Sequence, residues 1–86
     1  MYFKIYAKPK CIQCKMTNNL VQSLQIDNHK EIVDPETKAG QNIIEKLKSQ
    51  YHVRQMPFVQ VFDHQKLINS WTGFQPDKIK QYRKEA

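Results

Sequence analysis

The transition that decides the fold lies in Tyr2-Phe3-Lys4-Ile5-Tyr6-Ala7-Lys8-Pro9-Lys10-Cys11-Ile12-Gln13-Cys14. Residues 2–7 are β-formers that alternate between two faces, one carrying Tyr2, Lys4 and Tyr6 and the other Phe3, Ile5 and Ala7. This alternation predicts a strand, which Pro9 ends. From Ile12 to Ile26 the apolar period becomes helical, in the stripe Thr17, Leu20, Val21 and Leu24. The stretch therefore predicts a strand, a short loop and a helix that begins at two cysteines.

The middle of the chain predicts a second strand and a second helix. His29–Val33 is short and compatible with a strand. Asp34-Pro35-Glu36 is typical of a helix start, because an aspartate can accept from free amides and a proline needs no donor there. Gly40 should weaken this helix by about 1 kcal/mol relative to alanine. The apolar face is predicted to comprise Ile43, Ile44, Leu47 and Tyr51.

The last third predicts a hairpin and a third helix. The segments 58–62 and 66–71 read as strands, separated by the turn Asp63-His64-Gln65, which lacks a glycine. A final helix is expected from Pro76-Asp77 to Lys84. The predicted order is β-α-β-α-β-β-α, with the first two strands parallel through a right-handed crossover. We expect one α/β domain over residues 1–86.

Composition excludes several functional classes. The chain has 86 residues and a net charge of +6, but its lysines are dispersed and no arginine-rich run occurs, which disfavours nucleic acid as a partner. The N-terminus lacks the apolar stretch of a signal peptide, and no window has the length of a membrane span. We therefore expect a cytoplasmic monomer that binds neither nucleic acid nor membrane.

Cys11 and Cys14 are the only cysteines, and their position predicts redox chemistry. A bridge between them closes too small a loop to stabilise the fold much, so its purpose is expected to be chemical. Free amides and the positive dipole end at a helix N-terminus should lower the pKa of the Cys11 thiol, and Lys8, Lys10 and Lys15 act in the same direction. Cys11 is then the predicted nucleophile, and Cys14, one turn inside, resolves the mixed disulfide.

Zinc binding is the main alternative for the cysteine pair. Zinc needs about four ligands, and the remaining candidates are His29, His52 and His64. No two of these histidines are closely spaced, so the sequence favours a redox pair and predicts no metal.

Two further segments carry both a structural and a functional interpretation. Pro57 stands at the start of a predicted strand, as an ordinary trans proline or as a cis proline facing the cysteines, where Met56 could pair with an extended substrate. Gly73 is suited to a positive φ at the turn before the last helix. Trp71 and Phe74 are either core residues or part of a docking surface for a partner protein.

Together these pieces resemble the glutaredoxin-like branch of the thioredoxin superfamily, and within it the NrdH redoxins. The resemblance rests on Cys11-Ile12-Gln13-Cys14, Gln55-Met56-Pro57-Phe58-Val59 and Trp71-Thr72-Gly73-Phe74-Gln75-Pro76-Asp77, and it spans nearly the whole chain. It implies a thioredoxin/glutaredoxin-like α/β fold, with a four-stranded mixed sheet, three flanking helices and Pro57 in the cis form.

The resemblance also implies a function. NrdH redoxins are dithiol electron carriers that take electrons, ultimately from NADPH, from the flavoprotein thioredoxin reductase and reduce class Ib ribonucleotide reductase. Such proteins hold no bound cofactor and work through a reversible disulfide, here between Cys11 and Cys14. The resemblance places Met56 and Pro57 at the substrate ledge and Trp71 and Phe74 in the partner-facing region.

A glutathione-dependent glutaredoxin is the second functional hypothesis. Glutathione recognition would favour Thr-Val-Pro and a Gly-Gly turn where this chain has Gln55-Met56-Pro57 and Gly73-Phe74. Lys8 and Lys10 could still attract the carboxylates of glutathione. Gln75 replaces an arginine that NrdH redoxins commonly carry, which bears on partner preference.

Overall fold

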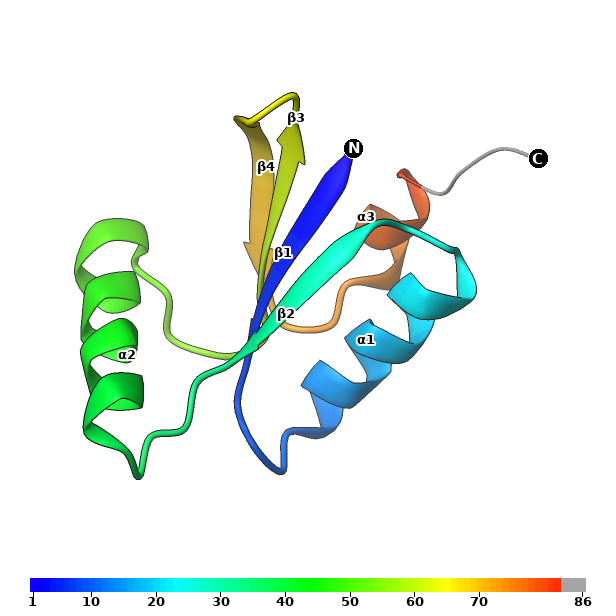
Figure 1. Cartoon of the computed structure of the whole chain (residues 1–86). Coiled ribbons are helices and arrows are strands. Elements are labelled where there is room, and N and C mark those ends of the chain that lie inside the picture. Colours follow the sequence, from blue (N-terminus) through cyan, green and yellow to red (C-terminus); the bar gives the residue numbers. More distant parts are fainter. Residues whose placement is uncertain (83–86) are drawn as a thin grey trace.

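A computed structural model describes residues 1–82 of the chain. The elements are β1 (Tyr2–Ala7), α1 (Ile12–Ser23), β2 (Asn28–Ile32), α2 (Lys38–Tyr51), β3 (Phe58–Asp63), β4 (Lys66–Thr72) and α3 (Pro76–Lys80). The strands form one sheet in the order β2-β1-β3-β4, with β1 and β2 parallel and the other two pairs antiparallel (Figure 1). The predicted thioredoxin/glutaredoxin-like element order and four-stranded mixed sheet are confirmed.

Helices cover both faces of the sheet, α1 and α3 on one and α2 on the other (Figure 1). The alternation predicted for β1 is present, because Phe3, Ile5 and Ala7 are buried while their neighbours are not. The larger core cluster lies against α1 and α3, and it comprises Phe3, Ile5, Val21, Ile26, Val59, Val61, Trp71 and Ile79. A smaller cluster lies against α2 and comprises Leu47, Val53 and Phe58, with Tyr6, Ile43 and Met56 packed on it.

The start predicted for the second helix is wrong by about one turn. Thr37 is the N-cap of α2, and its hydroxyl oxygen accepts from the Gly40 amide at 3.0 Å. Asp34 instead closes a turn before the helix, with its carboxylate accepting from the Glu36 amide at 2.9 Å. Threonine is a good N-cap as well, so the capping preference of Asp34 did not by itself fix where the helix begins.

The other two helices are shorter than predicted. α1 ends at Ser23 rather than Ile26, because Gln25 takes a positive φ of 57° and the Ile26 amide donates back to the Val21 carbonyl. α3 ends at Lys80, and the predicted extension to Lys84 passes beyond the described residues.

Glycine marks few of the turns in this chain. Within residues 1–82, five non-glycine residues have positive φ, namely Lys10, Gln25, His52, His64 and Gln65. The last two form a two-residue hairpin loop between Asp63 and Lys66, with the φ signs of a type I′ turn. Gly73 has the positive φ of 79° that its position predicted.

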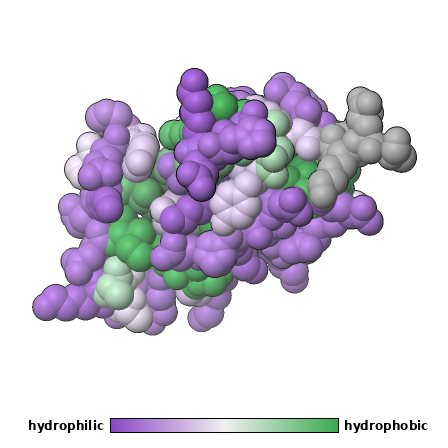
Figure 2. Space-filling model, turned by 45° about the horizontal axis from the view of Figure 1, so that its top comes forward, coloured by the Kyte–Doolittle hydropathy of each residue, from purple (hydrophilic) through white to green (hydrophobic). Residues whose placement is uncertain are grey.

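Hydrophilic side chains dominate the face shown in Figure 2, and the hydrophobic ones form small separate patches between them. Among residues 1–82, no helix has the length and apolar character needed to cross a bilayer.

Candidate functional site

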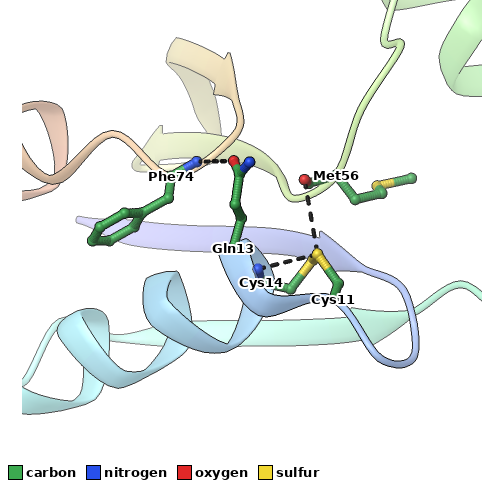
Figure 3. The surroundings of a disulfide bond; sticks show 5 residues. All are labelled: Cys11, Gln13, Cys14, Met56 and Phe74. Atoms are coloured by element: carbon green, nitrogen blue, oxygen red, sulfur yellow. Dashed lines mark hydrogen bonds between the residues drawn. A yellow bond between two sulfur atoms is a disulfide. The ribbon is translucent and has the colours of Figure 1, made fainter.

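Cys11 and Cys14 form a disulfide at the N-terminus of α1, with Cα atoms 5.2 Å apart. Cys11 is the N-cap of the helix, and its Sγ accepts from the Cys14 amide at 3.2 Å (Figure 3). Cys11 is partly exposed, whereas Cys14 is 6% exposed. The outer sulfur therefore lies where a helix amide can stabilise negative charge, and the inner sulfur is shielded from solvent.

The loop before β3 faces the outer sulfur. The Met56–Pro57 peptide bond is cis, as the resemblance implied. The Met56 carbonyl oxygen lies 3.9 Å from the Cys11 Sγ, on the side away from the helix (Figure 3). Pro57, the last residue of this loop, is buried, and its carbonyl accepts from the Gly73 amide at 2.9 Å. The predicted ledge residues thus lie beside the cysteine pair.

Gln13 joins the cysteine segment to the loop after β4, a role that the sequence did not reveal. Its Oε1 accepts from the Phe74 amide at 3.0 Å (Figure 3). A Cβ at position 73 would lie 3.1 Å from the Gln13 Oε1 and 3.2 Å from the Gln55 Nε2. The positive φ of Gly73 favours glycine at this position, and a Cβ there would also make the two glutamine side chains shift slightly.

The remaining predicted site residues fall into two groups. Lys8 and Lys10 line the same open pocket as both cysteines. Trp71 is 5% exposed and lies in the core, with its ring edge-on to Phe3 and stacked on Tyr82. Trp71 can therefore shape the site only through packing, while Phe74 remains partly exposed. Gln75, at the arginine position, donates to the Thr72 carbonyl at 2.8 Å and so closes its own loop.

Ile12 is a second residue of the site that the sequence did not reveal. Its side chain is 77% exposed although it stands between the two cysteines. An exposed isoleucine beside a reactive sulfur offers apolar contact to whatever approaches that sulfur. The sequence did contain a signal for this role, because Ile12 is an apolar residue that lies outside the predicted buried stripe of the helix.

A metal site finds no support in the described part of the chain. Among residues 1–82, no group of three or more histidine, cysteine, aspartate or glutamate side chains could hold a metal ion. His29, His52 and His64 are all exposed.

Comparisons with solved structures identify the fold. The chain aligns over 100% of its length with 100% of NrdH-redoxin from Escherichia coli, at 28% identity and a TM-score of 0.72. It covers 82% of the glutaredoxin Grx-1 from Archaeoglobus fulgidus at 22% identity and a TM-score of 0.71, with 92% of this chain aligned. Methanoredoxin from Methanosarcina acetivorans aligns with 95% of this chain and 83% of its own, at 22% identity and a TM-score of 0.72.

Sequence comparisons returned nothing comparable. No family model matches the chain. No curated protein matches it either. The resemblance to NrdH redoxins predicted from the motifs is confirmed by the structural likeness. A thioredoxin-fold chain with this cysteine pair is, in general terms, a thiol–disulfide oxidoreductase.

Proposed function

We propose that this chain is a cytoplasmic dithiol electron carrier that receives electrons from thioredoxin reductase and reduces class Ib ribonucleotide reductase. The observation that carries the proposal is the Cys11–Cys14 pair at the N-terminus of α1, in a chain that aligns end to end with E. coli NrdH-redoxin. That protein is described as glutaredoxin-like with a thioredoxin-like activity profile. The electrons come ultimately from NADPH through the flavin of the reductase.

The proposed reaction transfers two electrons in two exchange steps. The Cys11 thiolate attacks a sulfur of the substrate disulfide, which breaks and leaves one substrate thiolate and a mixed disulfide. The Cys14 thiolate then attacks the Cys11 sulfur, so that the intramolecular disulfide forms and the second substrate thiolate leaves. The substrate gains two electrons, and its thiolates take up two protons to become thiols.

The site geometry supports these roles. The Cys14 amide points at the Cys11 Sγ at 3.2 Å, so a thiolate there gains a hydrogen bond and the favourable helix dipole. Both effects lower the pKa of the Cys11 thiol in the reduced protein. Cys14 is the more buried of the two cysteines and is bonded to Cys11, as a resolving thiol requires.

The Gln13–Phe74 contact favours thioredoxin reductase over glutathione as the reductant. The Phe74 amide already donates to the Gln13 side chain, so it is not free to bind a carboxylate of glutathione. Gln13 and Gln55 also fill the space over Gly73, which a tripeptide lying on this turn would have to displace.

An NADPH-coupled disulfide reductase assay tests the proposal. One arm contains thioredoxin reductase, and the other contains glutathione and glutathione reductase. We expect NADPH oxidation only in the first arm, and the reduced protein should support deoxyribonucleotide formation by a class Ib reductase. Turnover only in the glutathione arm would show a glutaredoxin instead.

Substitution of each cysteine separates the two proposed roles. Cys11→Ser should abolish turnover, because no nucleophile remains at the helix tip. Cys14→Ser should still attack substrate but trap it as a mixed disulfide, visible by non-reducing electrophoresis and mass spectrometry. Equal trapping by both variants would contradict the assigned roles.

A further inference from the structure

A pocket of about 410 Å³ opens beside the cysteine pair, between the start of α1 and the edge strand β2. Both cysteines line it, together with four lysines: Lys8, Lys10, Lys15 and Lys30. The hollow on the Met56 side shares Lys8, Lys10, Cys11 and Ile12 with this pocket, but it is completed by Gln13, Gln55 and Met56 and lacks Lys15 and Lys30. The cysteine pair thus has a basic side, and only three of its four lysines, Lys8, Lys10 and Lys15, come from the cysteine segment.

The sheet topology brings the fourth lysine to this place. Because β1 and β2 are parallel, their carboxyl ends lie at the same edge as the loop that leads into α1 (Figure 1). Lys30 pairs in register with Ile5, whose side chain faces the α1 side, so Lys30 is on that face too.

The single acidic residue of β2 faces the opposite way. Glu31 is in register with Tyr6 and forms an ion pair with Lys4 at 3.9 Å. The pKa of Lys4 is raised, chiefly by a hydrogen bond with the Tyr6 side chain. Lys4 and Glu31 therefore neutralise each other on the α2 side of the sheet and leave the pocket charge unchanged.

The four pocket lysines are not neutralised from within the described chain. No carboxylate lines the pocket, and within residues 1–82 none of these ammonium groups forms an ion pair. Four like charges around one opening attract an anionic ligand and raise its association rate.

We propose that this pocket binds an acidic polypeptide segment next to the disulfide of the substrate protein. The proposal rests on the redox function proposed above and names the class of its substrate. Because Cys11 lines the pocket, a segment bound there lies beside the attacking sulfur. A polypeptide fits this position better than a nucleic acid, which carries phosphates but no disulfide to reduce. Ile12 and Ile32, 77% and 53% exposed, also line the pocket and fit the apolar side chains of a polypeptide.

The test compares two synthetic peptides that share one intramolecular disulfide. One carries three glutamates beside its cysteines, and its twin carries glutamines at the same positions. The protein is reduced, freed of reductant and mixed with excess peptide, and the peptide thiols formed are quantified after acid quench. At low salt we expect a second-order rate constant about tenfold higher for the glutamate peptide, falling toward equality at 0.5 M salt.

Lys30→Gln isolates the pocket from general charge, because Lys30 lies outside the cysteine segment. It should lower the glutamate-to-glutamine rate ratio by about two- to fivefold. Lys46→Gln is the matched control, since it removes the same charge from an exposed position on α2, across the sheet, and should leave the ratio unchanged.

Three outcomes would overturn this inference, and each differs from failure of the redox function. Equal rates for the two peptides would exclude acidic selectivity, and an equal effect of both lysine variants would exclude the pocket as its source. A rate with oxidised glutathione that matches the glutamate peptide, with the same dependence on Lys30, would assign the pocket to a small anion instead of a polypeptide. No reduction of any disulfide would refute the redox function itself.

Discussion

At the scale of single residues, Gln13 shows how a neutral side chain between two cysteines can organise a site. Its Oε1 ties α1 to the loop that follows β4, 61 residues further along the chain. Neither cysteine contacts that loop through a hydrogen bond. Gln13 therefore acts as a positioning residue for the surface on which a partner would dock.

Gln13→Met tests this contact. Methionine has a similar shape but no comparable acceptor, so the Phe74 amide should turn to solvent. We expect a loss of about 0.5–1.5 kcal/mol in the free energy of unfolding, measured by urea denaturation. Amide exchange at Phe74 should accelerate more than exchange in the distant strand pairs, and uniform acceleration would contradict a local role.

Gln13→Glu separates position from charge. A carboxylate can still accept from the Phe74 amide, so the loop should stay in place. The added negative charge lies near Cys11 and should raise the pKa of its thiol above that of the unmodified protein. Thiolate absorbance at 240 nm during a pH titration of the reduced protein measures this shift, and a lowered pKa would show that the electrostatic account is wrong.

The cysteine pair and Gly73 could be predicted from sequence because each follows a local rule. Spacing and helix position identified Cys11 and Cys14, and a turn before a helix identified Gly73. Gln13 was missed because its partner lies at position 74, and nothing local indicates that contact. For Trp71 the sequence left core and surface open, since burial depends on how Phe3 and Tyr82 converge.

At the scale of elements, Gly40 shows tertiary packing overriding helix propensity. The sequence suggested only that this glycine weakens α2. In the structure a Cβ at position 40 would overlap the backbone of Asp34, so the turn before the helix packs directly on it. Gly40→Ala should therefore lower the free energy of unfolding by about 1–3 kcal/mol, although alanine is the better helix former.

Asn42→Ala is the control for Gly40→Ala, since Asn42 is exposed in the same helix. Alanine there should leave the stability unchanged or raise it slightly. Thermal unfolding followed by circular dichroism compares the two variants. A Gly40→Ala protein as stable as Asn42→Ala would mean that the Asp34 turn moves away at little cost.

The β3–β4 hairpin shows why boundaries that no glycine marks were hard to predict. His64 and Gln65 hold φ values of 50° and 70°, which cost a residue with a side chain about 1–2 kcal/mol. The alternating strands predicted the hairpin, but only the backbone shows its two-residue loop. Gln25 and His52, at the ends of α1 and α2, also have positive φ without being glycine. The ends of these helices therefore carry no glycine from which they could be predicted.

Gln65→Gly should stabilise the protein by about 1 kcal/mol, because glycine adopts positive φ without steric cost. Gln22→Gly makes the same chemical change inside α1, where it should destabilise by about 1 kcal/mol. Chemical denaturation of both variants gives the two values. Destabilisation by Gln65→Gly would contradict the strain assigned to the loop.

At the scale of the whole molecule, the two faces of the sheet are unequally supported. Among the residues that the structure describes, the cluster under α1 and α3 has eight buried members, whereas the one under α2 has three. Regions with fewer buried apolar contacts open at lower free energy. We therefore expect α2 to be the first element that opens in the native state. Met56 packs on the cluster under α2 and also lies beside Cys11, so opening of α2 would release Met56 as well.

Leu47→Ala tests this hierarchy, because Leu47 is the α2 residue most buried in the smaller cluster. Truncation of this side chain should lower the free energy of unfolding by about 2–5 kcal/mol. Amide exchange in α2 should accelerate much more than amide exchange in β1 and β3. Val21→Ala, in the larger cluster, should instead lower protection in α1 and the central strands together. If α2 kept its protection in Leu47→Ala until global unfolding, the sheet and both helical layers would form a single cooperative unit. Exchange that is local to α2 would instead place Met56, one wall of the redox site, on the least stable part of the fold.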